Sequence, residues 1–301
     1  EPGIVAMIGP SRRSTSFDVE RVTRAKAGRS VAVVLPARNE APTVGAIVET
    51  IRTRLMDPSI GVVVDDLVVM DDQSSDRTAE VARAAGARVV STADVESGIA
   101  GGPGKGEALW KSVIATDADI ICWCDADVID FDGSYVLGLV GALCEDDDAV
   151  MAKGHYMRPA GAPGVEGVGG RVTELVVRPL IAMLHPDLAG LVQPLSGEFA
   201  VTRSAVEALP FARGYAVDLA LVIDIAAAHG AHRIVPVDLG IRRHRSQDIL
   251  SLGAMSTEIT AMVLRRAGIT VGPEVVLRQP TGPRTVATPL HDLPPVALRP
   301  S

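Results

Sequence analysis

The chain has 301 residues, of which 47% are hydrophobic and only 3% are aromatic, and its formal net charge is −8. This length fits one large α/β domain with an appendage, and the core must consist of Val, Ala, Leu and Ile, as in parallel sheets covered by helices. The acidic balance argues against general binding to nucleic acid or to an anionic membrane surface. Three cysteines indicate a reducing compartment, and no apolar run is long enough to span a membrane, so a soluble cytoplasmic protein is expected.

The first half of the chain alternates short apolar runs with segments of helical periodicity. Residues 1–29 are interpreted as a loose arm with one helix. Pro36 is expected to end the first strand, Asn39 to cap the helix after it, and Gly86 to end a later helix. The predicted strands are 30–35, 66–70, 87–91 and 119–124. The predicted helices are 17–27, a helix whose apolar residues run from Val44 to Leu55, and 78–85. Three strand-then-helix units within 116 residues predict an α/β fold with a mostly parallel, doubly wound sheet.

The pattern is looser in the second half. Residues 159–170 are expected to form a flexible loop, and Pro179 should kink or shorten the helix that contains it. The Pro-rich tail from residue 272 suggests no elements. The predicted strands are 149–155, 197–202 and 232–237, and the predicted helices are 171–184, 217–229 and 254–267.

Polar clusters follow three of the predicted strands. They are 36–40, Asp71 with Asp72, and Asp125 with Asp127. Ligands bind beyond the carboxyl ends of parallel strands, and the two last carboxylates share a face, so they could hold a divalent cation and through it a diphosphate. An ordinary strand-to-turn junction also accounts for one such Asp pair. The coincidence of three clusters favours a nucleotide site.

A glycine-rich segment at 101–106 contains Lys105 and leads into a helical segment. Such a turn suits phosphate, through free N–H groups and a positive charge. A mobile surface loop explains it equally well. The spacing is not that of a Walker A loop, and the first strand has no glycine fingerprint of a dinucleotide-binding dehydrogenase.

These motifs resemble known glycosyltransferases. The strings 34–40, 70–76 and the Asp-x-Asp at 125–127 resemble those of the GT-A fold, in which Asp-x-Asp binds ribose and a metal–diphosphate. The likeness to glucosyl- and mannosyl-3-phosphoglycerate synthases covers most of 30–267. It rests on the strings 103–110, 169–176, 194–198, 214–218 and 244–245.

The resemblance implies a metal-dependent hexosyltransferase. It would move mannose from GDP-mannose or glucose from UDP-glucose, with retention, to the 2-hydroxyl of 3-phosphoglycerate. The resemblance also implies a homodimer. It also implies a nucleotide-sugar half at 30–155, an acceptor half of the same domain at 156–267, and a tail at 268–301.

Site residues follow from the same resemblance. Asp127 and His244 would hold Mg²⁺ or Mn²⁺, and Asp125 the ribose. Glu198 and Asp218 would face the reacting sugar as catalytic residues. Pro36, Ala37, Glu40, Asp72 and Lys105 would line the nucleotide-sugar site, and Gly170, Arg171, Thr173, Arg242 and Ser246 would bind substrate, with Arg171 and Thr173 on the acceptor's phosphate and carboxylate.

Two positions depart from the family pattern, which has Glu where this chain has Asp218 and Asn where it has Ser246. The shorter Asp218 slightly favours acceptance of GDP-mannose. Two other functions fit part of the sequence. One is an inverting GT-A transferase acting on a different phosphorylated acceptor, with Glu198 or Asp218 as general base; the other is a non-catalytic nucleotide-binding protein.

Overall fold

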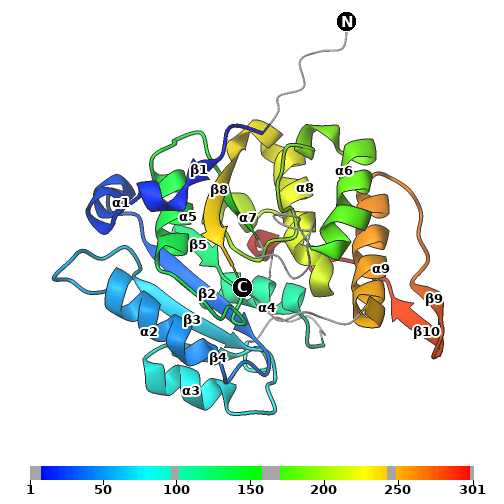
Figure 1. Ribbon diagram of the computed structural model, residues 1–301, viewed down its shortest axis with the longest axis horizontal. Coiled ribbons are helices and arrows are strands. Elements are labelled where there is room, and N and C mark those ends of the chain that lie inside the picture. The colour runs from blue at the N-terminus through cyan, green and yellow to red at the C-terminus, as the bar shows by residue number, and fades with distance from the viewer. Residues whose placement is uncertain (1–7, 96–101, 158–169, 243–248, 299–301) are drawn as a thin grey trace, which may run out of the picture.

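One mixed sheet with helices on both faces forms the centre of the protein (Figure 1). The structure is a computed structural model and describes residues 8–95, 102–157, 170–242 and 249–298. The strands lie in the order β1-β8-β6-β7-β5-β2-β3-β4. Their bounds are β1 (Arg12–Arg13), β2 (Val31–Ala37), β3 (Asp66–Asp71), β4 (Arg88–Ser91), β5 (Ile120–Trp123), β6 (Met151–Met157), β7 (Phe199–Thr202) and β8 (Ile234–Ile241).

Every pair of neighbouring strands in this sheet is parallel except the two pairs that β7 makes. β7 runs antiparallel to both β5 and β6. The expected mostly parallel α/β sheet of the GT-A type is therefore confirmed. Because β7 is reversed, its first residues lie at the same edge of the sheet as the last residues of β5.

Alternation of side chains along the strands divides the core into two layers. Val33 and Leu35 pack with α1, α2, α3 and α5 on one face, and Val34 packs with α4, α6, α8 and α9 on the other. The helices are α1 (Val19–Lys26), α2 (Val44–Leu55), α3 (Thr78–Ala85), α4 (Lys105–Ala115), α5 (Ser134–Cys144), α6 (Arg178–Leu184), α7 (Arg203–Val206), α8 (Val217–His229) and α9 (Ile249–Arg266). Among the described residues, no helix is both long and apolar enough to cross a membrane.

Two expectations at the end of β2 are wrong. The strand does not stop at Pro36, because Ala37 still pairs with Asp71 of β3 and accepts a hydrogen bond from the N–H of Asp72 at 2.9 Å. Asn39 does not cap α2, whose N-cap is Thr43. The backbone of Asn39 is left-handed (φ +60°), and its side chain accepts a hydrogen bond from the N–H of Ser75.

Elsewhere the predicted elements are found, one of them interrupted, and β1, α5, α7 and a hairpin in the tail are additions. No pattern in the sequence indicated α5, because this helix is buried on nearly all sides and lacks an alternating polar face. The tail contains a hairpin, β9 (Glu274–Gln279) with β10 (Gly282–Ala287), which projects from the body (Figure 1). Around Pro179 the helix is divided into a π-helical turn, η2 (Thr173–Val177), and α6.

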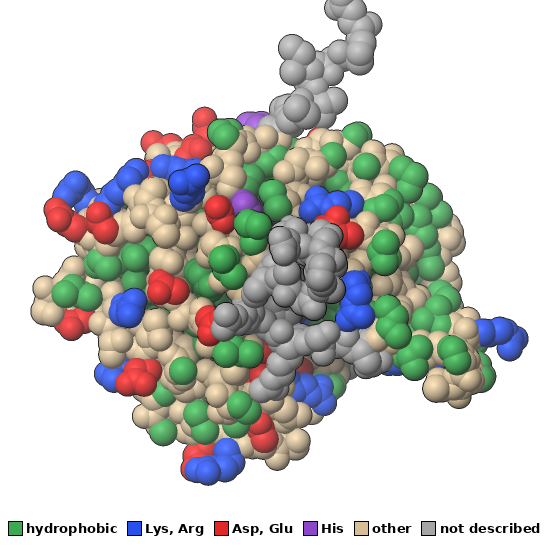
Figure 2. All heavy atoms as spheres, in the orientation of Figure 1, with side chains coloured by type: hydrophobic (Ala, Val, Ile, Leu, Met, Phe, Trp, Pro, Cys, Tyr) green, Lys and Arg blue, Asp and Glu red, His purple; other side chains and the backbone are tan. Residues whose placement is uncertain are grey.

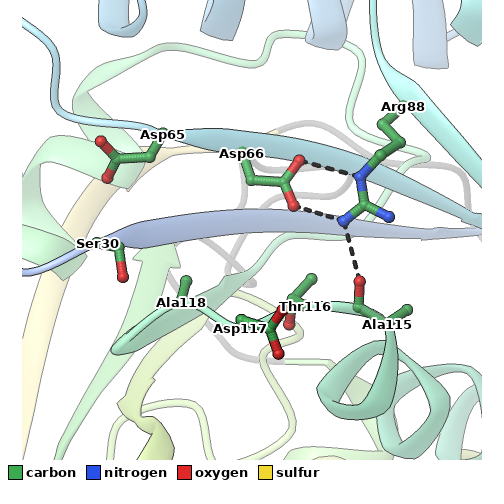
Figure 3. Close-up of a pocket in the computed structure, with 8 residues that line it drawn as sticks. All are labelled: Ser30, Asp65, Asp66, Arg88, Ala115, Thr116, Asp117 and Ala118. Atoms are coloured by element: carbon green, nitrogen blue, oxygen red, sulfur yellow. Dashed lines mark hydrogen bonds and ion pairs between the residues drawn. The ribbon is translucent and has the colours of Figure 1, made fainter.

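A shallow depression of about 470 Å³ lies at the amino ends of the strands (Figure 3). Ser30, Asp65, Asp66, Arg88 and Asp117 line it. The polar clusters singled out in the sequence lie at the opposite, carboxyl edge.

Candidate active site

The carboxyl ends of three adjacent strands place the predicted donor residues together. β2 pairs with β3 on one side and with β5 on the other. Pro36 and Ala37, the last residues of β2, therefore lie beside the loops that contain Asp72 and Asp125 with Asp127, as the sequence predicted.

The loop after β2 is tied to the loop after β3. Asn39 and Gln73 both have left-handed backbones, with φ of +60° and +58°. The N–H of Asn39 donates to Ser74 Oγ at 3.0 Å, and the N–H of Glu40 donates to Thr78 Oγ1 at 2.8 Å. Strained residues of this kind persist where surrounding bonds fix them, and they are common at binding sites. The wall that contains Pro36, Ala37 and Glu40 is thus held in place by the loop after β3 and the first residue of α3.

Asp72 links β3 to the glycine-rich segment. Its side chain is buried, and its two oxygens accept hydrogen bonds from the N–H of Gly104 at 2.9 Å and from Thr92 Oγ1 at 3.1 Å. Burial raises the pKa of Asp72, against these hydrogen bonds and the nearby Arg38. The segment before α4 is therefore anchored to the nucleotide side of the site.

Lys105 bridges two carboxylates from different elements. It is the first residue of α4, where a cation opposes the helix dipole. Its Nζ lies 2.8 Å from Asp125 Oδ1 and 2.7 Å from Asp218 Oδ2. Burial would raise the pKa of Asp125, but the charges of Lys105 and Arg242 outweigh burial and lower this pKa to about 2. Burial raises the pKa of Asp218 in spite of Lys105.

Arg242 contacts three carboxylates, one of which, Asp125, also binds Lys105. Arg242 follows β8, and its side chain is only 2% exposed. Its Nη1 forms an ion pair with Glu198, and its Nη2 lies 3.2 Å from Asp127 Oδ1 and 3.6 Å from Asp125 Oδ2. Glu198 is fully buried and also accepts a hydrogen bond from Ser196 Oγ at 2.8 Å. Burial raises the pKa of Glu198, and burial with the neighbouring Asp125 charge raises the pKa of Asp127.

Sequence reasoning missed Lys153 and Gly197. Lys153 of β6 is 1% exposed, donates from Nζ to the carbonyl of Ser196 at 2.6 Å, and lies over the ring of Phe199. Burial lowers its pKa to about 8. A Cβ on Gly197 would lie 2.2 Å from Asp125 Oδ1, so only glycine lets this carboxylate pack against the start of β7. The available signal was a lysine inside an otherwise apolar strand.

The predicted acceptor residues form a second group at the start of the helical segment before α6. Arg171 is exposed, whereas Thr173 is buried at the first position of η2. Gly170 accepts a hydrogen bond from the N–H of Glu174 at 2.9 Å, which begins the helical turn. Unpaired N–H groups and a guanidinium at such a terminus suit an anion. His244 and Ser246 lie outside the described residues.

The side chains at this edge of the sheet could hold a divalent cation together with oxygens of a bound ligand. No group of three or more His, Cys, Asp or Glu suited to a metal occurs among the described residues. The Asp127 side chain is 37% exposed, so its carboxylate is accessible from solvent. Mg²⁺ is commonly held by one or two carboxylates together with substrate phosphates, and Asp127 can supply such an oxygen.

The fold and this edge of the sheet define a nucleotide-sugar-dependent glycosyltransferase. A mostly parallel sheet presents an Asp-x-Asp pair, a lysine at a helix start and a rigid two-loop wall at its carboxyl edge. In agreement, residues 32–162 match the sequence model of the family described as Glycosyl transferase family 2.

More similar relatives narrow this class. The chain is 46% identical over 256 residues to glucosyl-3-phosphoglycerate synthase of Mycolicibacterium smegmatis, covering 84% of this chain and 83% of that protein. It is 40% identical to the enzyme of the same name from Petrotoga mobilis, covering 78% and 73%. A crystal structure of the Mycobacterium tuberculosis enzyme with Mn²⁺, UDP-glucose and phosphoglyceric acid superimposes with a TM-score of 0.86 at 38% identity, over 98% of this chain and 99% of that one. The chain belongs to the glucosyl-3-phosphoglycerate synthase family.

Proposed function

We propose that this protein transfers glucose from UDP-glucose to the 2-hydroxyl of 3-phosphoglycerate in a reaction that depends on Mg²⁺ or Mn²⁺. The observation that carries the proposal is the buried ionic network at the carboxyl edge, in which Lys105 and Arg242 hold Asp125, Asp127, Glu198 and Asp218. A non-catalytic nucleotide-binding protein would have no need to bury so many charges beside its ligand.

The nucleotide would lie against Pro36, Ala37, Glu40 and Asp72, with its ribose on Asp125. A divalent cation on Asp127, and on His244 as the family resemblance implies, supplies Lewis-acid stabilisation of the charge that develops on the departing diphosphate. Lys105 holds Asp125 in one orientation and adds a fixed positive charge beside that leaving group.

The hexose would lie against Asp218. Asp218 Oδ2 is bound by Lys105, but its buried Oδ1 has no hydrogen-bond partner among the described residues. An unpaired buried oxygen is unfavourable, and a sugar hydroxyl can satisfy it. Asp218 Oδ1 therefore accepts a hydrogen bond from a hydroxyl group of the hexose that is transferred.

The buried state of Glu198 favours retention. A general base must reach the acceptor hydroxyl, whereas Glu198 is fully buried and held by Arg242 and Ser196. Asp218 is likewise held by Lys105. Without a free base, catalysis relies on positioning the acceptor for attack from the leaving-group face. NMR of the fresh product should show the anomeric configuration of the donor, and inversion would restore Glu198 or Asp218 as a general base.

The acceptor would bind at Gly170, Arg171 and Thr173. The direct experiment measures UDP release from UDP-glucose with 3-phosphoglycerate and Mn²⁺, and omits each component in turn. We expect release only with all three. An Arg171→Gln variant should raise the KM for 3-phosphoglycerate and leave the KM for UDP-glucose unchanged. No release from the complete mixture would refute the proposal.

Three finer points belong to the same proposal. GDP-mannose is a second, weaker donor, tested by GDP release under the same conditions. The protein works in the cytoplasm, which agrees with three buried cysteines that are all free.

The protein forms a homodimer, for which light scattering is the test. Figure 2 shows hydrophobic side chains gathered over α6, near which Leu175 and Met183 are 75% and 69% exposed.

A further inference from the structure

Arg242 occupies an unusual place for a residue expected to bind substrate. Its guanidinium lies beneath the site and makes contact with Asp127, the carboxylate assigned to the divalent cation. It is also fixed from below by the fully buried Glu198 and stacks 4.9 Å from the ring of Tyr156. A side chain held on these sides cannot swing out into solvent.

The position of Arg242 matters for any cation on Asp127. A dication bound by this carboxylate would stand within one carboxylate group of a fixed positive charge. Water screens part of this repulsion at Asp127, which is 37% exposed, but hardly at the guanidinium, which is 2% exposed. Asp127 in turn has a cationic partner without a metal, since Arg242 Nη2 donates to its Oδ1.

We propose that Arg242 couples metal binding to nucleotide binding: it holds Asp127 while the nucleotide is absent and so weakens the binding of a divalent cation until a nucleoside diphosphate arrives. The inference rests on the proposed function, because it places the cation at Asp127. The diphosphate brings negative charge that offsets the fixed charge of the guanidinium beside the cation. Each ligand then strengthens the binding of the other by the same factor.

The experiment measures Mn²⁺ binding directly, by loss of the EPR signal of free Mn²⁺, with and without UDP. We expect the wild-type protein to bind Mn²⁺ weakly alone and more tightly with UDP. In Arg242→Gln, binding of Mn²⁺ alone should be about tenfold tighter, and the gain from UDP should shrink by a similar factor. If Arg242→Gln leaves Mn²⁺ binding without UDP unchanged or weaker, the proposal is wrong.

Two further variants keep the test decisive. Arg242→Gln alone leaves Glu198 buried without its partner, so the double variant Arg242→Gln with Glu198→Gln removes both charges together and should still bind Mn²⁺ alone more tightly than wild type. Glu198→Gln alone frees the guanidinium for Asp127 and should weaken Mn²⁺ binding. A double variant that binds no better than wild type would overturn the proposal.

Lys153→Met is the matched control for charge. Lys153 is also buried beside this network, but its Nζ donates to the Ser196 carbonyl rather than to Asp127. We expect a smaller change in Mn²⁺ affinity than in Arg242→Gln; an equal change would mean that total charge, not contact with Asp127, sets the affinity. The Mn²⁺ binding experiment contains no UDP-glucose and does not depend on turnover. If the protein released no UDP from UDP-glucose, the proposed function would be wrong, but the Mn²⁺ binding data would still test the role of Arg242.

Discussion

Both edges of the sheet contain acidic and basic side chains in pairs, but among the described residues only the carboxyl edge buries both members of a pair. At the amino edge, Asp66 and Arg88 form an ion pair whose side chains are 34% and 44% exposed (Figure 3). At the carboxyl edge, Glu198 is fully buried and Arg242 is 2% exposed. An exposed pair adds little to stability, whereas a buried one must offset the desolvation of both charges.

Since ion pairs occur at both edges of the sheet, pairing of charges does not by itself mark an active site. The carboxylates of the amino edge remain in contact with water. Those of the carboxyl edge have shifted pKa values, downward at Asp125 and upward at Asp127, Glu198 and Asp218. Burial combined with opposed pKa shifts is typical of functional sites.

The largest expected effect is on turnover at the carboxyl edge. Asp127→Asn keeps the shape of the side chain but removes the charge that holds a cation, so kcat should fall about 10³-fold. Steady-state UDP release measures it. The matched change at the amino edge, Asp66→Asn, should alter kcat by less than about twofold. Comparable losses in both variants would end the distinction between the edges.

The second effect is on stability. Lys105→Met leaves Asp125 and Asp218 buried without their shared cation, and the free energy of unfolding should drop by about 3–5 kcal/mol. Lys26→Met removes the partner of Asp65, which is 39% exposed and can be hydrated, so a loss of about 1 kcal/mol is expected. Urea unfolding measures both. Equal losses would show that the network at Lys105 is no more costly to break than an ordinary pair.

The third effect is a dependence on pH. Burial lowers the pKa of Lys153 to about 8 in the folded protein, below that of about 10.4 in the unfolded chain. Between these values the unfolded chain binds more protons, so the folded protein gains stability as the pH rises. The stability of wild type relative to Lys153→Met should therefore increase from about pH 8 to about pH 10, in urea unfolding at several pH values. A difference that stays constant over this range would contradict the assignment.

The smallest effect belongs to the amino edge. Arg88→Gln breaks the pair with Asp66, and both side chains remain hydrated, so the free energy of unfolding should change by less than about 1 kcal/mol. The KM for UDP-glucose should stay at the wild-type value. A clear rise in this KM would assign the depression in Figure 3 a part in donor binding.

The cluster of polar residues at the ends of β2, β3 and β5 was predictable because its signals are local. Short apolar strands that end in Asp72 or in Asp125 and Asp127 reveal both the sheet and the edge where ligands bind. The residues of the second half were named only through the resemblance to a family, since nothing in the local pattern around Asp218 or Glu198 brings them to Lys105.

What could not be predicted depends on contacts between distant segments. The reversed strand β7 brings Ser196 to Lys153 and Gly197 to Asp125. No periodicity in the sequence indicates that this strand lies between β5 and β6. Arg242 was expected among the substrate ligands, and nothing in the local sequence indicated its contacts with Asp127 and Glu198. The helix α5 was missed because a helix buried on all sides has no amphipathic pattern.

The reversal of β7 has a consequence for protein engineering. Glu198 reaches the site from the segment that precedes its strand, whereas Asp72 and Asp127 reach it from segments that follow theirs. The exposed positions of segment 189–196, such as Val192, can therefore be varied while β2, β3 and β5 keep their turns. The buried Leu191, Gln193 and Ser196 must be kept, because they pack in the core or bond to Tyr156, Lys153 and Glu198. A library at the exposed positions changes the segment that leads to Glu198 and leaves the segments of Asp72 and Asp127 untouched.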